Sequence, residues 1–321
     1  MDTADDSSEI TYIPEGIVPD LEVDDDVYRF LEYFSLDWPA QSIDFINPTQ
    51  LVVGTNPPEE HKQSISIISF SNPLESLFDA MGEFTVQKLS TKHSVNRIRW
   101  NDSLYLLGDE LLSIYNNKNE LIKEIKGEFG YGIGFSKEEY FIGSKSGEII
   151  TPFEKHQVHT KSIECIDVFN NTMFTGSCDY KAISTDIRSW EQIFELPFSC
   201  DINCLGFNGD NTLGLGCDDG VIRLVDIRNT KNCEDIKWHS TPISCFMWGS
   251  RDVFATGSDE QVCLWDTSFI EDWNFHRYLS FIHQGHTFYK SVMFWKESPE
   301  YVITSALEGL CVFSPIETIF Q

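Results

Sequence analysis

The chain has 321 residues, of which 41% are hydrophobic and 13% aromatic, so it is able to bury a sizeable core. Its formal net charge is −28 at neutral pH. That charge weighs against free nucleic acid as the main ligand, because phosphate backbones are bound through Lys and Arg. It favours a basic protein as partner, although a strongly acidic surface also serves solubility alone.

The N-terminal segment, residues 1–26, is acidic and contains no Lys or Arg before Arg29. Its tract DLEVDDD repels itself, which predicts a largely extended or disordered segment. The segment lacks the basic and apolar pattern of a secretory signal, and no apolar run in the chain reaches membrane-spanning length. The nine cysteines are odd in number and scattered. We therefore expect an intracellular protein with reduced thiols.

The next stretch, VYRFLEYF at residues 27–34, suits either a short helix or a strand with one apolar face. Asp24, Asp25 and Asp26 precede it and are suited to cap a helix. Because a ring of strands must close without a free edge, we expect Tyr33–Leu36 to complete the last blade of such a ring.

Short apolar strands separated by turns then follow one another. We assign LDWPAQSIDF, LVVGT and SISIISF to a first blade, with residues 71–83 as a longer connection. KHSVNRIRW, LYLLG and LLSIY form a second blade. LIKEIKGEFGYGIGF, YFIGS and GEIITPF form a third, and FIHQGHTFYKSVMFW with YVITSALEGLCVF forms the last.

The stretch from His159 to Asp266 repeats itself at a shift of forty residues. Aspartates recur at two positions of this period: at Asp179 and its two equivalents, and at the last residue of each repeat. A period of about 40–45 residues with a terminal Trp-Asp is typical of a WD-repeat β-propeller blade. The repeated aspartates are Asp179, Asp219 and Asp259, and then Asp186, Asp226 and Asp266.

Each repeat predicts a polar network that fixes its blade. The repeated Asp accepts backbone N–H groups at a tight turn. A His about twenty residues earlier donates to it, and Ser177 or Trp265 completes the network. Thr185 and Val225 stand where the third repeat has Trp265, so the first two networks are expected to be incomplete. The predicted network residues are His159, Ser177, Asp179, Asp219, His239, Asp259 and Trp265.

The fold class predicted from these patterns is all-β: a seven-bladed WD-repeat β-propeller over residues 27–321 with a short acidic N-terminal extension over residues 1–26. No enzyme is predicted. His159, Ser177 and Asp179 could spell a hydrolytic triad, but the same residue types recur as scaffold. The pairs His156–His159 and His283–His286 lack two further ligands for zinc. No nucleotide-binding glycine pattern and no cofactor site is present.

The ordered motifs resemble one family of WD-repeat proteins. The run VYRFLEYFSLDWPAQSIDF with LVVGT is similar to the entrance of the histone-binding and ribosome-assembly group. YIPEGI, HSVNRIRW, GYGIGFS, HTKSIECIDV and the ending FIHQGHTFYKSVMFW…VITSALEGLCVF resemble the glutamate-rich WD-repeat protein family, called the regulator of ribosome biosynthesis in fungi. The likeness extends from Tyr12 to Phe313. The family's long Glu-rich insertion is missing here, since residues 71–83 are short.

The resemblance implies a ribosome biogenesis factor of the nucleus and nucleolus. It is also compatible with shuttling from the cytoplasm. Family members bind a basic ribosomal protein of the large subunit, the one numbered three, and accompany it to the pre-ribosomal particle. No membrane contact and no direct nucleic-acid contact is expected. The related branch implies histones as the alternative partner. The positions that match the family's motifs, the spacing of DINCLGF and two acidic neighbours together predict a partner site. Its residues are Asn96, Glu128, Tyr131, Glu164, Asp201, Asn203 and Asp218.

A further alternative comes from the sequences TDIR and VDIR, which end in Arg188 and Arg228. Such Asp-x-Arg endings resemble the motif by which some propellers dock to a ubiquitin-ligase adaptor. The other interpretation is that these arginines only join strands through ion pairs with neighbouring loops.

Overall fold

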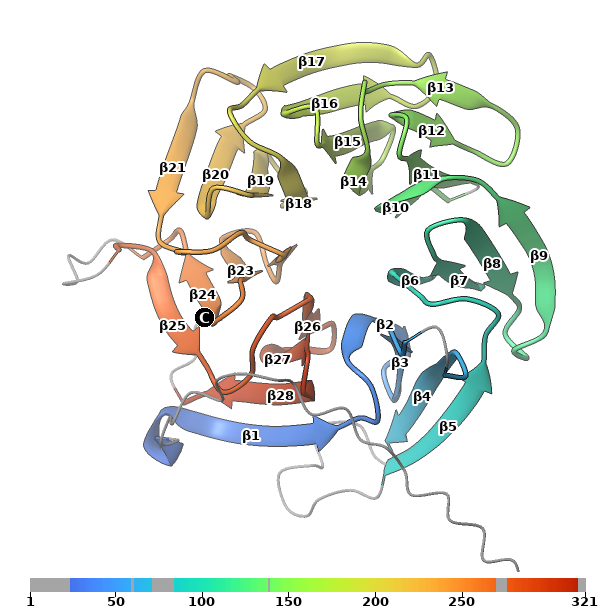
Figure 1. Ribbon diagram of the computed structural model, residues 1–321. Coiled ribbons are helices and arrows are strands. Elements are labelled where there is room, and N and C mark those ends of the chain that lie inside the picture. The colour runs from blue at the N-terminus through green and yellow to red at the C-terminus, as the bar shows by residue number, and fades with distance from the viewer. Residues whose placement is uncertain (1–23, 59–60, 71–83, 138, 270–275, 317–321) are drawn as a thin grey trace, which may run out of the picture.

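The structure is a computed structural model that describes residues 24–58, 61–70, 84–137, 139–269 and 276–316. Within these residues it contains seven four-stranded antiparallel sheets, arranged as blades around a central axis (Figure 1). This is the seven-bladed, all-β propeller that the sequence predicts. The acidic stretch of residues 1–23 and the connection of residues 71–83 lie outside the described residues.

The first three blades follow the chain order, each with its first strand innermost. They consist of β2 (Ala40–Asn47), β3 (Gln50–Thr55), β4 (Ser64–Phe70) and β5 (Phe84–Ser90); then β6 (Arg97–Trp100), β7 (Leu104–Leu107), β8 (Leu111–Tyr115) and β9 (Leu121–Lys126); then β10 (Phe129–Phe135), β11 (Tyr140–Ser144), β12 (Glu148–Ile150) and β13 (Lys155–Gln157).

The next three blades correspond to the forty-residue repeats. They consist of β14 (Ile163–Phe169), β15 (Thr172–Ser177), β16 (Lys181–Asp186) and β17 (Glu191–Pro197); then β18 (Ile202–Phe207), β19 (Thr212–Cys217), β20 (Val221–Asp226) and β21 (Cys233–Lys237); then β22 (Cys245–Trp248), β23 (Val253–Gly257), β24 (Val262–Asp266) and β25 (Leu279–His283).

The last blade combines the two ends of the chain. Strands β26 (Ser291–Trp295), β27 (Ser298–Ala306) and β28 (Gly309–Pro315) are completed by the N-terminal strand β1 (Tyr28–Ser35), which lies along β28 in Figure 1. The pairing runs from Tyr28 opposite Pro315 to Ser35 opposite Gly309. The predicted closure by the N-terminal segment is therefore correct. The strand begins earlier than predicted, and Leu36 lies outside it.

Residues 28–34 form a strand, so the helical alternative is wrong. A short 3₁₀ turn, Asp25–Val27, precedes it, and Asp24 accepts a hydrogen bond from the backbone N–H of Asp26 at 3.1 Å. The strand is favoured because its apolar side chains pack on the last blade: Phe30 and Phe34 join the core cluster that contains Tyr301. A helix would not present a ladder of backbone groups to β28.

Two segments belong to a different blade from the one that the sequence suggested. LIKEIK forms β9, the outer strand of blade two, and LSFIH forms β25, the outer strand of blade six. The sequence pattern places LIKEIK, and of LSFIH the residues 281–283, in the following blade. In both places the outer strand is followed along the chain by the loop that enters the next blade, and the sequence pattern does not mark where one blade ends.

Burial explains why the strands differ in composition. The middle strands pack between neighbouring blades on both faces and are mostly apolar, as in β3 and β23, where almost every residue is buried. The outer strands face solvent, and β9 and β17 are exposed over most of their length. The core therefore lies between blades: Phe254 and Trp265 of blade six stack with ring centroids 6.0 Å apart and share a cluster with Ile222 of blade five.

Candidate functional site

One face of the propeller collects the loops that the sequence analysis singled out. In an antiparallel blade, the start of the first strand, the end of the second and the start of the third lie at the same end. We call this end of the ring the rim face. It carries the loop that enters the innermost strand and the turn between the second and third strands of each blade. The turns between first and second strands lie on the opposite face.

In blade four the structure joins His159 to Asp179. His159 Nδ1 lies 3.0 Å from one carboxylate oxygen, and the same carboxylate accepts the backbone N–H of Thr160 at 2.9 Å and of Lys181 at 3.2 Å. Burial raises the pKa of Asp179, but the N–H of Thr160 and the His159 ring outweigh it, so the pKa lies below its usual range. The carboxylate is thus the centre of this network.

The other nitrogen of His159 contacts Thr175, which the sequence analysis did not select. His159 Nε2 lies 2.8 Å from Thr175 Oγ1. Ser177 is fully buried, and its hydroxyl binds the backbone of Asp179 and of Lys161. His159, Ser177 and Asp179 therefore do not have the geometry of a hydrolytic triad, because the histidine faces Thr175 instead of the serine.

Blade six differs from the prediction. His239 Nδ1 lies 3.0 Å from Ser258 Oγ, while Nε2 contacts Thr256 Oγ1 at 2.8 Å, which also accepts Trp265 Nε1–H at 2.8 Å. Asp259 is therefore not the partner of His239. Gly257 pairs with Val262 here, whereas Gly176 pairs with Ala182 in blade four, so the turn of blade six is one residue shorter.

Blade five replaces the histidine altogether. Arg223 donates two hydrogen bonds to the Asp219 carboxylate, at 3.0 and 2.6 Å, and its side chain is 9% exposed. Asp219 also accepts the backbone N–H of Val221 at 3.1 Å, which is the turn role that the repeat predicts. The hydrogen bonds from Arg223 hold the pKa of Asp219 below its usual range.

The paired histidines take aromatic partners. The His156 ring stacks on Trp190 with centroids 3.5 Å apart, and the His283 ring stacks on Phe313 at 4.1 Å. His286 packs edge-on against Tyr33 at 5.0 Å. Together with the hydrogen bonds from His159 to Asp179 and Thr175, these contacts account for the four histidines as parts of blade packing.

The predicted partner residues form two groups on the rim face. In the first, the buried Asn96 and the ammonium of Lys145 both donate to Asp109, the latter at 2.9 Å, and these bonds lower the pKa of Asp109. The carboxylate of Glu128 is exposed and lies close enough to Lys145 to help raise the pKa of that lysine, after the bond to Asp109.

Tyr131 connects the rim to the central channel. Its backbone oxygen accepts Arg97 Nε–H at 3.3 Å, and its half-buried ring lies near the carboxylates of Asp109 and Glu164. Burial, followed by these two charges, raises the pKa of its phenol. Tyr131 is therefore a partly exposed aromatic side chain beside acidic groups, which is suited to anchor a partner.

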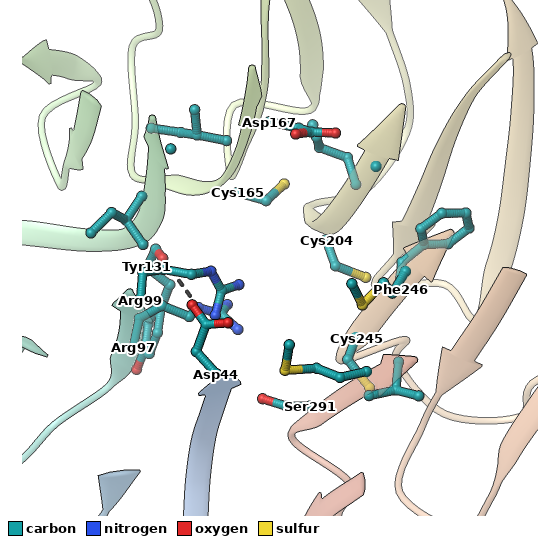
Figure 2. A pocket seen from close by; sticks show the side chains of 18 of the residues that line it. Asp44, Arg97, Arg99, Tyr131, Cys165, Asp167, Cys204, Cys245, Phe246 and Ser291 are labelled. Carbon is teal, nitrogen blue, oxygen red and sulfur yellow. Dashed lines mark hydrogen bonds between the residues drawn. The ribbon is translucent and has the colours of Figure 1, made fainter. Parts of the chain in front are cut away.

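The channel is a cavity of about 460 Å³ that touches the innermost strand of every blade. Figure 2 shows Arg97, Arg99 and Asp44 together on one side, and cysteines from three neighbouring blades on another. Asp44 accepts the backbone N–H of Trp100 at 2.8 Å and so connects blades one and two. Burial raises the pKa of Asp44 and lowers that of Arg99.

The second group surrounds the thiol of Cys178. Its sulfur lies 3.5 Å from a Glu164 carboxylate oxygen, and Asp201 also contacts it. Burial first, and then these two carboxylates, raise the pKa of the thiol. Next to them the Asn203 side-chain amide donates to Asp218 at 3.4 Å, and Asp218 N–H donates to the backbone oxygen of Asp201 at 3.0 Å.

The sequence analysis missed Asp109, Lys145 and Cys178. Lys145 and Cys178 directly follow the second strand of their blades, as Asp218 does, and Asp109 lies one residue further along. Extending the position of Asp218 to the neighbouring blades would have found them. Arg97 is the fourth residue missed, because its strand position gives no sign that its side chain reaches the channel.

The two Asp-x-Arg endings lie in the turns after β16 and β20. Arg188 pairs with Asp186 and Arg228 with Asp226, at 2.6 and 2.7 Å, so each pair closes its own turn. The prediction that these arginines pair with neighbouring loops is wrong. The pairs are too exposed to contribute much stability.

Comparison with known proteins supports the fold. Residues 179–251 match the family model described as the anaphase-promoting complex subunit 4 WD40 domain. Over 139 residues, 41% of this chain, the sequence is 28% identical to the human kinesin-like protein KIF21B and 29% identical to the mouse one. The match spans 8% of the length of those kinesin-like proteins.

The WD40 beta propeller domain of Doa1 is similar over nearly the whole structure, with a TM-score of 0.72 at 13% identity, covering 91% of this chain and 97% of that chain. The chain thus has the WD40 propeller fold, which proteins use as a scaffold for binding other proteins. Among the described residues, no helix has the length and apolar character needed to cross a membrane.

Proposed function

We propose that the protein is a binding scaffold for a basic ribosomal protein of the large subunit, the one numbered three, which it accompanies to the nucleolar pre-ribosome. The motifs at both ends of the chain that resemble the glutamate-rich WD-repeat family support this partner. The net charge of −28 supports a basic one.

The observation that carries the proposal is the acidic group on the rim face. Glu164 and Asp201 flank one thiol, with Asp218 beside them and the half-buried Tyr131 next to Glu164. Carboxylates at such a rim steer a basic partner and set specificity, while a buried aromatic side chain keeps dissociation slow. Association should therefore depend strongly on salt, since the Debye length falls from about 10 Å at 0.1 M to about 3 Å at 1 M.

The test is the double reversal of Glu164→Lys with Asp201→Lys. The matched control is Asp252→Lys with Glu297→Lys, which makes the same charge change at exposed residues on turns of the opposite face. Surface plasmon resonance with the purified ribosomal protein should show association slowed about tenfold or more by the rim reversal. The control should change it far less, because its charges lie away from the rim.

Histones are the competing partner, because they are basic and the related branch binds them. A pull-down that offers both classes together at moderate salt separates the two. Retention of the ribosomal protein, lost on the rim reversal, supports the proposal. Retention of histones alone, or equal binding by wild type and reversal, would contradict it.

A further inference from the structure

Blade five carries two thiols that face each other at the rim. Cys200 lies in the loop before β18, and Cys217 is the last residue of β19. Their sulfur atoms and a carboxylate oxygen of Asp219 all lie within 4.8 Å of one another. Cys217 is fully buried and Cys200 is half-buried, so only Cys200 of the pair is partly exposed to solvent.

The surroundings favour ionisation of the outer thiol. Arg223 Nη1 lies 3.9 Å from Cys200 Sγ while the same guanidinium holds Asp219. The thiol of Cys217 donates a hydrogen bond to Cys200, and chiefly for that reason the pKa of Cys200 is lowered to about 7. The lowered pKa increases the share of Cys200 that is thiolate at neutral pH, which is the reactive form.

The pKa values of the other two cysteines that are not buried are raised instead. All nine cysteines lie in the described residues, and six of them are buried. Cys233 is exposed, but burial of its sulfur and the nearby Asp235 carboxylate, 3.7 Å away, raise its pKa to about 11. Burial, followed by the carboxylates of Glu164 and Asp201, raises the pKa of Cys178 and keeps it protonated. By exposure alone, Cys233 would be expected to react first with an oxidant. The lowered pKa of Cys200 makes Cys200 the more reactive thiol instead.

We propose that Cys200 and Cys217 form an oxidant-sensitive pair in which a hydroperoxide oxidises Cys200 and Cys217 then closes a disulfide. With hydrogen peroxide, the Cys200 thiolate attacks one oxygen, an S–O bond forms as the O–O bond breaks, and the departing hydroxide takes a solvent proton to become water. The Cys217 sulfur then attacks the sulfenic sulfur of Cys200. An S–S bond forms as the S–O bond breaks, and the Cys217 proton leaves with the hydroxide as a second water.

The backbone around the pair is arranged for this closure. The residues that follow the two cysteines, Asp201 and Asp218, already share a backbone hydrogen bond of 3.0 Å. The two segments are therefore held together before oxidation, with the two sulfur atoms already within 4.8 Å of each other.

A metal ion is the other use of two thiols and a carboxylate. Structural zinc takes four ligands, and here the Arg223 guanidinium occupies the carboxylate with two hydrogen bonds. A divalent cation would have to displace this buried positive charge. The geometry therefore favours thiol chemistry over metal binding.

The test begins with wild-type protein treated with hydrogen peroxide at pH 7, alkylated and mapped by mass spectrometry. The expected product is a Cys200–Cys217 link that has lost two hydrogens and is restored by dithiothreitol, while Cys233 is still alkylated. Cys217→Ser keeps a hydroxyl donor but cannot close the link, so it should stop at a Cys200 sulfenic acid that a dione probe traps.

Cys217→Ala is the matched variant, since it also removes the donor. If the pKa of Cys200 returns to its usual value of 9.0, its thiolate fraction at pH 7 falls about fiftyfold. The higher nucleophilicity of the more basic thiolate offsets part of this, so the oxidation rate should fall about sixfold. Thermal unfolding of both variants checks that the blade is intact.

Three results would overturn the proposal. The first is that Cys233 is oxidised in the wild type as fast as Cys200 or faster. This result does not depend on the folding of any variant. The second is oxidised Cys200 without a link to Cys217. The third is stoichiometric zinc binding by the reduced protein that Cys200→Ser abolishes, because the pair would then be a metal site.

Discussion

Blades four and six build their polar networks from the same first pair, a buried histidine and a threonine of the second strand, 2.8 Å apart in both. They differ in what the other histidine nitrogen meets. In blade four it is the carboxylate of Asp179, and in blade six it is the hydroxyl of Ser258. A turn that is one residue shorter causes the difference, so a shared period does not guarantee a shared partner.

Blade five shows a third arrangement at the same position. Arg223 replaces the histidine and holds Asp219 from the third strand, and the two thiols occupy the space beside it. The three blades therefore keep one requirement, that the polar groups of the turn be paired, and meet it with different residues.

The largest expected effect comes from Asp179→Ala, which removes the centre of the blade-four network. The ring of His159 and the backbone N–H groups of Thr160 and Lys181 lose their acceptor. We expect the free energy of unfolding to fall by about 4 kcal/mol, because buried donors are left unpaired. Urea denaturation measures it, and a loss below about 1 kcal/mol would show that water replaces the carboxylate.

The second prediction uses the lack of a carboxylate beside His239. Burial lowers its pKa to about 4, so the folded protein keeps it neutral while the unfolded chain takes up a proton below about 6.5. Its contribution is therefore complete above pH 6.5 and is lost as the pH falls toward 4. The loss is about 1.4 kcal/mol per pH unit, about 3 kcal/mol in all.

The measurement is denaturation of wild type and His239→Gln at pH 7 and pH 4.5. Because the carboxylates titrate in both proteins, the difference between the two isolates His239. The variant should lose less stability on acidification than the wild type. An equal loss would mean that His239 is protonated in the folded state.

A smaller effect is expected for Ser258→Ala, since it removes one neutral partner of His239. The cost should be about 1–2 kcal/mol, because Nδ1 is left buried and unpaired. Thr256 still holds the other nitrogen, so the blade should remain folded. The unfolding midpoint of Ser258→Ala should fall less than that of Asp179→Ala. A larger fall for Ser258→Ala would mean that Ser258 is the more important acceptor.

The smallest effect is expected for Asp259→Ala, although the repeat aligns it with Asp179. Asp259 is half-buried, and burial raises the pKa of its carboxyl, so its charge gains little from the fold. We expect a change below about 0.5 kcal/mol, as for ordinary surface positions. A loss near that of Asp179→Ala would show that the blade-six turn adopts the blade-four arrangement in solution.

The rim residues were only partly within reach of the sequence. Positions such as Glu164 and Asp201 follow from their place before and within the innermost strands, which repeats from blade to blade. Lys145 and Cys178 needed the second-strand position to be applied to each blade. Arg97 needed the structure, because its side chain reaches across to blade three and the channel.

The sequence by itself determined the all-β class, the seven blades and the closure by the N-terminal strand. These depend on local alternation and a fixed period, which each strand carries in its own residues. Only the tertiary structure decided the outer-strand assignment, the exchange of Asp259 for Ser258 and the pairing of Cys200 with Cys217. Such side-chain partners depend on turn length and on segments that the chain brings together from different strands. The turn between the second and third strands is one residue shorter in blade six than in blade four, so the residue that the repeat aligns with Asp179 is not the one that meets the histidine.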